Sequence, residues 1–243
     1  MPATRPRAIY DVKRALPGYD GPLLRVRHCE LNTVVDWCPE MTTFLGKSAA
    51  AVEIWYDQSP HQRHAVQPIP SLQPFLRALD DGTAVVDFRP NRFLHLPAGT
   101  VPYGSAPFSI LFKHGEIDNP IGGIIGSGQY GAPNLVNCVR RDWSRYVNYF
   151  WDNDLHTPIG TYTPGNVVAF TFAANGTRTA VINGDITATA HGARFSHPEN
   201  NTIGKTYGEN EYLNGELEFV HVTEEIAPLS VSFETGEWLG VGV

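Results

Sequence analysis

Charge, cysteine and long apolar runs are all scarce in this sequence. Only 18 % of the 243 residues are charged, and the formal net charge is −7. A chain with an excess of acidic groups has no overall positive field to attract a nucleic-acid backbone, so we expect no nucleic-acid partner. No apolar run approaches the roughly 20 residues that a membrane-spanning helix needs. Residues 1–11 also lack the apolar core of a signal peptide, so neither membrane insertion nor export by a signal peptide is expected.

The sequence has three cysteines, Cys29, Cys38 and Cys138. This number is small and odd, whereas a disulfide framework needs several pairs. A bridge between Cys29 and Cys38 is expected only if the protein meets an oxidising compartment. The sequence also contains no Cys-x-x-Cys or His-Glu-x-x-His spacing. Neither a disulfide-stapled scaffold nor a zinc site is therefore predicted.

Turn residues and short apolar runs, by contrast, are abundant. The chain has 23 glycines, 19 prolines and 42 % hydrophobic residues, which is typical of a globular β protein large enough to bury a core without staples. A short helix is predicted at 8–16, because Ile9, Val12 and Leu16 fall on one helical face. Alternating or apolar segments predict strands at 23–29, 49–56, 108–113, 122–125, 135–139, 145–151, 201–204, 212–222 and 229–233.

Glycine-containing turn dipeptides separate several of these runs. Asp81-Gly82 indicates a hairpin, and Asn214-Gly215 another turn. Asn175-Gly176 and Asn183-Gly184 predict two type I′ turns, which would make a three-stranded meander over 167–190. The whole pattern predicts an all-β, two-sheet antiparallel jelly-roll sandwich with one short N-terminal helix. We expect a flexible N-terminal arm at 1–7, a single domain over 8–233 and a C-terminal tail at 234–243.

Several segments, in the same order, resemble a known family. Residues 10–27 (YDVKRALPGYDGPLLRVR) precede WYDQSPHQRHAVQ at 55–67, where the family reads WYDQSGNGNHATQ. Short matches follow from Gln73-Pro74 to Phe93-Leu94, and again at 203–204 and 212–218. Together they are similar to the laminin-G-like, concanavalin-A-like jelly roll that fungal α-L-arabinofuranosidases share with bacterial and viral surface proteins. The resemblance covers residues 8–229 and implies the fold, which hosts lectins, hydrolases and structural modules alike.

The resemblance also implies where catalytic carboxylates would lie in a hydrolase. The family's nucleophile is the Glu of a DMENN segment, and the best match, at 150–154, places Asp152 there. The segment of the family's acid corresponds to 203–209, where Glu209 is a displaced carboxylate. Asp152 is one methylene shorter than Glu, and a misplacement near 1 Å costs about a hundredfold in rate. The family's adjacent Cys pair has no counterpart around 113–125, so we expect the catalytic activity to be lost.

A binding function is indicated by residues 142–154, DWSRYVNYFWDND. Aromatic rings pack against the apolar faces of sugars, while carboxylates accept hydrogen bonds from sugar hydroxyls. The predicted ligand residues are Trp143, Tyr146, Trp151, Asp152 and Asp154. Because strand side chains alternate between faces, half of the aromatic residues would face the core instead, and that alternative stays open. Loop carboxylates could also hold a calcium ion at 152–154 together with Glu209.

Residues 55–58, WYDQ, are interpreted as a structural corner in which Asp57 bonds turn amides. The function predicted from the whole sequence is a non-catalytic, lectin-like or structural protein on the surface of a larger particle, plausibly a virion or phage. Its partners would be other structural proteins of that particle, copies of itself, or a glycan. The alternative is a glycoside hydrolase of the arabinofuranosidase type, with Asp152 and Glu209 as its paired carboxylates.

Overall fold

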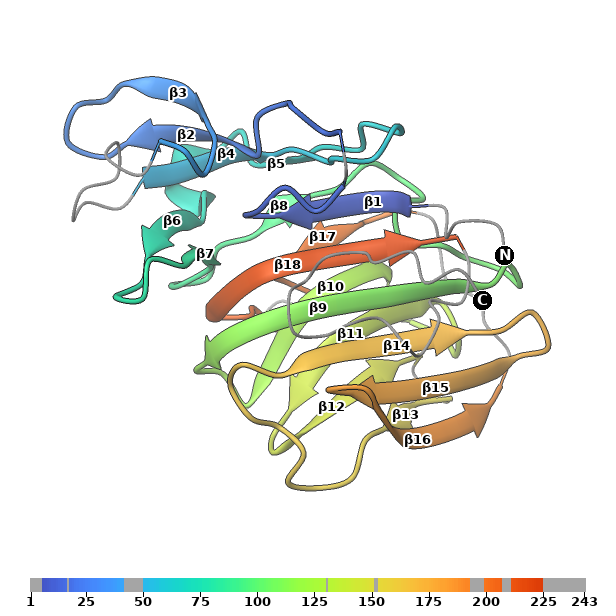
Figure 1. Ribbon diagram of the computed structural model, residues 1–243. Helices are drawn as coiled ribbons and strands as arrows, with labels where there is room; N and C mark the ends of the chain where they lie inside the picture. The colour runs from blue at the N-terminus through green and yellow to red at the C-terminus, as the bar shows by residue number, and fades with distance from the viewer. Residues whose placement is uncertain are drawn as a thin grey trace.

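The strands expected from the alternation pattern form a two-layered β structure (Figure 1). The computed structural model describes residues 6–16, 18–41, 50–129, 131–150, 153–192, 199–206 and 211–224. Within them the strands are β1 Pro6–Asp11, β2 Leu24–His28, β3 Val34–Trp37, β4 Ala50–Trp55, β5 Ala65–Val66, β6 Phe75–Ala78, β7 Ala84–Asp87, β8 Leu94–His95, β9 Phe108–Ile117, β10 Ile121–Gly128, β11 Val136–Asp142, β12 Arg145–Tyr149, β13 Leu155–His156, β14 Val167–Phe172, β15 Thr177–Ile182, β16 Asp185–His191, β17 Thr202–Ile203 and β18 Gly215–Thr223. One 3-10 turn, η1, spans Pro70–Leu72.

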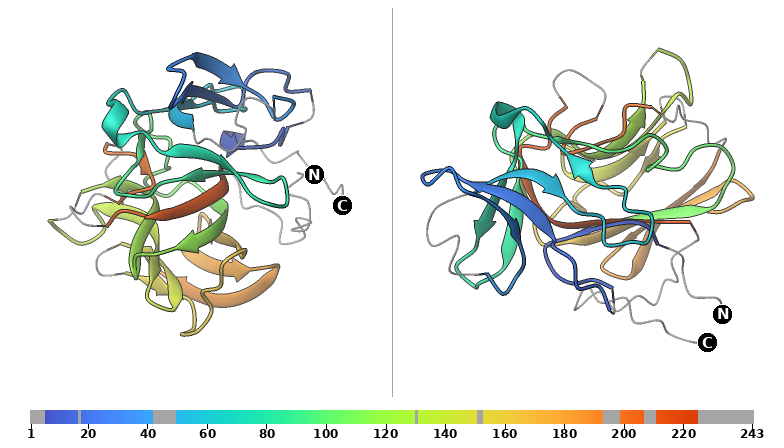
Figure 2. Two further views of the ribbon diagram at one scale, coloured as in Figure 1. Left: turned by 90° about the vertical axis from the view of Figure 1, so that its left-hand side faces the viewer. Right: turned by 90° about the horizontal axis from the view of Figure 1, so that it is seen from above.

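The strands pair into two antiparallel layers. The first layer runs β1–β18–β9–β14–β15–β16. The second runs β13–β12–β11–β10–β17–β8–β5 behind it (Figures 1 and 2). Strand β4 pairs with β5, β2 and β6, and the β6–β7 hairpin pairs onto β18, so this end of the sandwich joins both layers. The predicted all-β, two-sheet antiparallel sandwich is confirmed.

Alternating residues of both layers fill one large core. Tyr10, Phe112, Phe170 and Val220 contribute from the first layer, and all are fully buried. Burying one such side chain is worth about 1.5–3 kcal/mol. A second, smaller cluster gathers residues of opposite parity on the first layer: Leu111, Val167, Ala169, Val181 and Phe219. The first layer is therefore apolar on both of its faces.

The meander over β14–β16 has one turn of the predicted type and one of another type. Asn183 and Gly184 have φ of 51° and 93°, as a type I′ turn requires, so this prediction is confirmed. At the other turn, Gly176 has φ of 85° but Asn175 does not enter the left-handed region. Four residues link these strands, and the Asn175 side chain accepts a hydrogen bond from Thr177 N at 3.0 Å. The longer loop needs left-handed geometry only at the glycine, so the type I′ prediction was wrong there.

The N-terminal helix predicted at 8–16 is replaced by strand β1 and an irregular segment. Ala8 and Tyr10 point into the core and lie opposite Val222 and Val220 of β18. The free edge of β18 supplies backbone partners for β1, and this long-range pairing overrides the local apolar spacing. Residues 6 and 7, predicted to belong to a flexible arm, are the first two residues of β1.

The turn between β6 and β7 tests the hairpin predicted at Asp81-Gly82. Gly82 has φ of 83° between β6 and β7, which confirms the Asp81-Gly82 hairpin.

All three cysteines are free. Cys29 follows β2 at the closed end of the β2–β3 hairpin, whereas Cys38 follows β3 at its open end. That separation is roughly 15–20 Å at about 3.3 Å per residue, too far for a disulfide, whose Cα atoms lie about 4.4–6.8 Å apart.

Several predictions fall on residues outside those that the structure describes. They are the arm at 1–5, the strand at 229–233, the tail at 234–243, Trp151, Asp152 and Glu209. Strand β12 ends at Tyr149, two residues before the predicted end. Over the described part of the chain, no helix has the length and apolar character to cross a membrane.

Candidate functional site

The corner at the end of β4 is built around the carboxylate of Asp57, which is 1 % exposed. Its Oδ1 accepts hydrogen bonds from the backbone N–H of Ile9 and Ser59, both at 2.8 Å. Its Oδ2 accepts from Arg63 N at 2.7 Å and from Ser59 Oγ at 2.8 Å. Four donors satisfy the buried charge and tie the corner to β1. The interpretation of this stretch as a structural corner is confirmed.

Gln58 extends this corner toward the N-terminal segment. Its Oε1 accepts a hydrogen bond from Ala15 N at 2.9 Å, and its Nε2 donates to Lys13 O at 2.7 Å. The Gln58 backbone N–H donates to Ile9 O at 2.9 Å. The side chain therefore holds the segment after β1 in place against the corner. Sequence reasoning missed this role, although the Gln directly after the corner Asp in the run WYDQS is the signal that could have indicated it.

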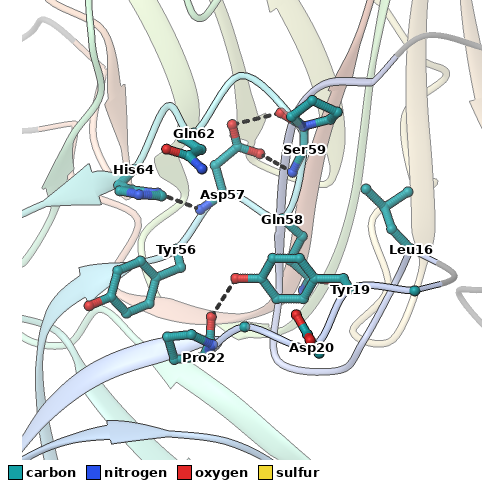
Figure 3. A pocket seen from close by; sticks show the side chains of 13 residues that line it. Leu16, Tyr19, Asp20, Pro22, Tyr56, Asp57, Gln58, Ser59, Gln62 and His64 are labelled. Carbon is teal, nitrogen blue, oxygen red and sulfur yellow. Dashed lines mark hydrogen bonds between the residues drawn. The ribbon is translucent and has the colours of Figure 1, made fainter.

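These two segments enclose an open hollow of about 580 Å³ (Figure 3). This size lies within the range of roughly 300–1,000 Å³ that is usual for small-molecule sites. One wall is the segment 16–22, and the other is the corner at 56–64. The described lining residues are Leu16, Gly18, Tyr19, Asp20, Gly21, Pro22, Tyr56, Asp57, Gln58, Ser59, Pro60, Gln62 and His64.

Two tyrosines give the hollow its aromatic walls. Tyr19 donates its hydroxyl proton to Pro22 O at 2.7 Å, and Tyr56 donates to Asp36 Oδ1 at 2.9 Å. Burial raises the pKa of Tyr19, and burial together with the Asp36 hydrogen bond raises the pKa of Tyr56 to about 12. Both phenols are therefore neutral, and their hydroxyl protons are already committed. What they offer to a ligand is a ring face.

His64 contributes a fixed donor to the same hollow. The backbone N–H of Asp57 donates to His64 Nδ1 at 3.1 Å, which places the imidazole proton on Nε2. Burial lowers the pKa of His64 below its ordinary value, so the ring is neutral at pH 7. Its ring lies edge-on to Tyr56, with centroids 5.0 Å apart. The Nε2–H has no hydrogen-bond acceptor among the described residues and is available to a ligand.

The residues predicted to bind a ligand do not form one patch. Trp143 lies at the tip of the β11–β12 hairpin and is 66 % exposed, with a left-handed φ of 58°. Asp154 lies beyond the other end of β12, and its Oδ1 accepts a hydrogen bond from Phe150 N at 2.8 Å. The five residues of β12 separate these two positions by about 17 Å. Trp151 and Asp152 lie outside the described residues.

Tyr146 is a core residue, so its prediction as a ligand-binding ring was wrong. It is 0 % exposed, and its hydroxyl lies 2.6 Å from His114 Nε2. Asn166 Nδ2 donates to the same hydroxyl at 3.3 Å. Burial lowers the pKa of His114 to about 4 and raises that of Tyr146 to about 12. Both groups are neutral, and the network satisfies polar atoms inside the sandwich.

Asn148 of β12 is buried beside this core. Its Nδ2 donates to Asn137 Oδ1 at 3.0 Å, and its Oδ1 accepts from Arg178 at 3.3 Å. Among the residues that the structure describes, no group of three His, Cys, Asp or Glu side chains could hold a metal ion. A calcium ion at 152–154 with Glu209 stays a prediction.

The β-sandwich fold of this chain is shared with several solved structures. The chain resembles an α-L-arabinofuranosidase of glycoside hydrolase family 54, soaked with a cyclic sulfate inhibitor, with a TM-score of 0.65 and 13 % identity over 93 % of this chain. It also resembles an arabinofuranosidase complexed with arabinofuranosyl-α-1,2-xylobiose, with a TM-score of 0.62, 14 % identity and 93 % of this chain covered. The match covers 60 % of each of those chains, so this chain spans less than two thirds of their length.

A third similar structure is a binding domain of a mosquitocidal protein. The binding domain of a paraclostridial mosquitocidal protein matches 87 % of this chain and 51 % of its own, with a TM-score of 0.54 and 12 % identity. No family model matches the sequence, and a search of curated proteins finds no match either. At these identities, the likenesses establish a shared fold. The function has to be argued from the chain's own residues.

Proposed function

We propose that this protein is a non-catalytic glycan-binding β-sandwich and that the hollow between segments 16–22 and 56–64 is its sugar site. The observation that carries the proposal is the set of side chains in that hollow. The rings of Tyr19 and Tyr56 offer faces for the C–H side of a sugar, since their hydroxyl protons are bonded elsewhere. Asp20, Gln62 and His64 Nε2–H offer polar groups at its border (Figure 3).

The rest of the molecule is consistent with a preformed site. The hollow's floor is fixed by the four hydrogen bonds to Asp57 and by the side-chain bonds of Gln58. A preformed site loses less conformational entropy when a ligand binds. The shared fold with the arabinofuranosidases supports sugar recognition by analogy. We also assign the sandwich to the laminin-G-like, concanavalin-A-like jelly rolls, on the order of the segments quoted above.

A glycan array probed with the purified chain tests the proposal, followed by titration calorimetry with the strongest binder. Tyr56→Ala removes one aromatic wall and should reduce affinity about tenfold, because an aromatic stacking contact is worth about 0.5–1.5 kcal/mol beyond the area that it buries. Tyr103→Ala is the matched control, since Tyr103 is 51 % exposed and lies outside the hollow. Tyr56→Phe keeps the ring and should keep the affinity. Unchanged binding by folded Tyr56→Ala would refute the site.

A hydrolase of the arabinofuranosidase type is the second candidate, and the fold match over 93 % of the chain favours it. Asp152 and Glu209 would then be the paired carboxylates. Incubation with 4-nitrophenyl α-L-arabinofuranoside tests this function directly. Under our proposal, no nitrophenol is released. Release that disappears in both Asp152→Asn and Glu209→Gln would establish the hydrolase instead. Placement on a virion or another particle, with structural partners or further copies, stays a prediction from the sequence.

A further inference from the structure

The hollow has an unbalanced charge. Among its described lining residues there is no lysine or arginine, whereas two carry carboxylates. The carboxylate of Asp57 is buried and used by four protein donors. Asp20 is exposed, and no described residue forms a hydrogen bond or ion pair with its carboxylate. The accessible charge of the hollow is therefore the single negative charge of Asp20.

Two arginines near the hollow already have protein partners. Arg14 donates to Tyr19 O at 3.2 Å and to Gly21 O at 2.9 Å, so it braces the segment that carries Asp20 from outside. Arg25 forms two hydrogen bonds to Asp36, at 2.9 and 3.1 Å. Recognition of an acidic sugar normally uses a guanidinium in a bidentate contact with the ligand carboxylate. Neither of these arginines lines the hollow.

From this arrangement we infer that Asp20 is the specificity-determining residue of the hollow and that it selects uncharged sugars with two adjacent hydroxyl groups. This inference rests on the proposed function. A carboxylate has two acceptor oxygens and can accept from two neighbouring hydroxyls at once. The neutral His64 supplies one donor through Nε2, and the Gln62 amide supplies both a donor and an acceptor. An acidic sugar would place a second negative charge beside Asp20 without a cation to balance it.

The test is a comparison of matched neutral and sialylated glycans. The probes are galactose-terminated oligosaccharides and the same oligosaccharides capped with sialic acid, titrated into wild-type protein, Asp20→Asn and Asp20→Lys. Asp80→Asn is the matched control, because Asp80 is also exposed and does not line the hollow. We expect wild type to bind the neutral glycans at least tenfold more tightly than the sialylated ones. Asp20→Asn should weaken binding of the neutral glycans about tenfold and reduce the preference for neutral over sialylated glycans. Asp20→Lys should reverse that preference.

The outcomes separate this inference from the proposed function. Glycan binding that requires Tyr56 but shows no preference for neutral glycans, or is unchanged in Asp20→Asn, would overturn the role of Asp20 and leave the sugar site standing. Absence of binding to every glycan on the array would overturn the proposed function, and this inference with it. Far-UV circular dichroism and thermal unfolding of each variant confirm that the fold is intact. Asp80→Asn should match wild type in every measurement.

Discussion

His114 should make the protein markedly less stable in acid. The imidazole lies in β9 with no exposed surface, between the Tyr146 hydroxyl at Nε2 and the Gly115 carbonyl at Nδ1, and it stacks on Tyr162. Burial lowers its pKa from the ordinary 6.5 to about 4. The unfolded chain therefore takes up the proton first as the pH falls. Stability attributable to this group is complete above pH 6.5 and is lost between pH 6.5 and pH 4.

The size of the loss follows from the two pKa values. Each pH unit between them is worth 1.36 kcal/mol, so the interval from 6.5 to about 4 corresponds to about 3 kcal/mol. That is a large share of the roughly 5–15 kcal/mol that stabilise a typical domain. Burial also lowers the pKa values of His64, His95 and His156, but solvent reaches these rings and reduces their contributions.

Urea unfolding at several pH values, followed by tryptophan fluorescence, measures this effect. His114→Gln keeps an acceptor near the position of Nε2 but cannot take up a proton in this range. At pH 7 the variant should be less stable than wild type because the ring packing is lost. Towards pH 4 the difference should shift by about 3 kcal/mol in favour of the variant. A difference that stays constant within about 0.5 kcal/mol over this range would refute the assignment of a buried, neutral His114.

Three further predictions concern the corner, one glycine and the hollow. Asp57→Asn should lower the free energy of unfolding by about 2–4 kcal/mol, because two of the four donors lose their acceptor and meet an N–H₂ group instead. Thermal unfolding measures this loss, with Asp80→Asn as the control, whose stability should lie within about 0.5 kcal/mol of wild type. Gly204→Ala should lower the free energy of unfolding by more than about 2 kcal/mol, because Gly204 has φ of 84° and a Cβ there would lie 2.1 Å from the Phe88 ring. A thermal stability equal to that of wild type would contradict this geometry. Glycan affinity should fall in acid, because protonation of His64 removes the acceptor for Asp57 N; since burial lowers the pKa of His64, the fall should begin below the ordinary histidine value of 6.5. A pH-independent affinity in calorimetry would contradict that role.

Local chemistry explains which parts of the fold could be predicted from the sequence. The Asn183-Gly184 turn is dictated by two residues that tolerate positive φ, and no distant contact is needed to form it. Alternation likewise located β2, because this strand buries one parity of its side chains. The helix predicted at 8–16 failed for the opposite reason. Residues 8–11 of that segment form part of strand β1 because they pair with β18, more than 200 residues away in the chain.

The candidate site was harder to predict because its two walls are distant in sequence. The stretch 55–59 is recognisable in the sequence, but no local feature links the ring of Tyr19 and the carboxylate of Asp20 to it. The links are hydrogen bonds from backbone N–H groups to side chains of the corner, from Ile9 N to Asp57 Oδ1 and from Ala15 N to Gln58 Oε1. For Tyr146, alternation could not decide the face, because β12 buries three consecutive residues and is covered on both sides.

Asp57 and Asp20 show most clearly what separates a structural carboxylate from a functional one. Both are aspartates, and both line the same hollow. Asp57 receives four protein donors and has little capacity left for a ligand, so its substitution should cost stability and affect binding only through the damaged fold. Asp20 has no such protein donors, so its substitution should change binding while leaving unfolding unchanged. The distinction depends on which donors reach each side chain. Of the four donors of Asp57, the Ile9 amide belongs to strand β1, whose position only the folded chain determines, and the other three belong to Ser59 and Arg63 of the corner itself.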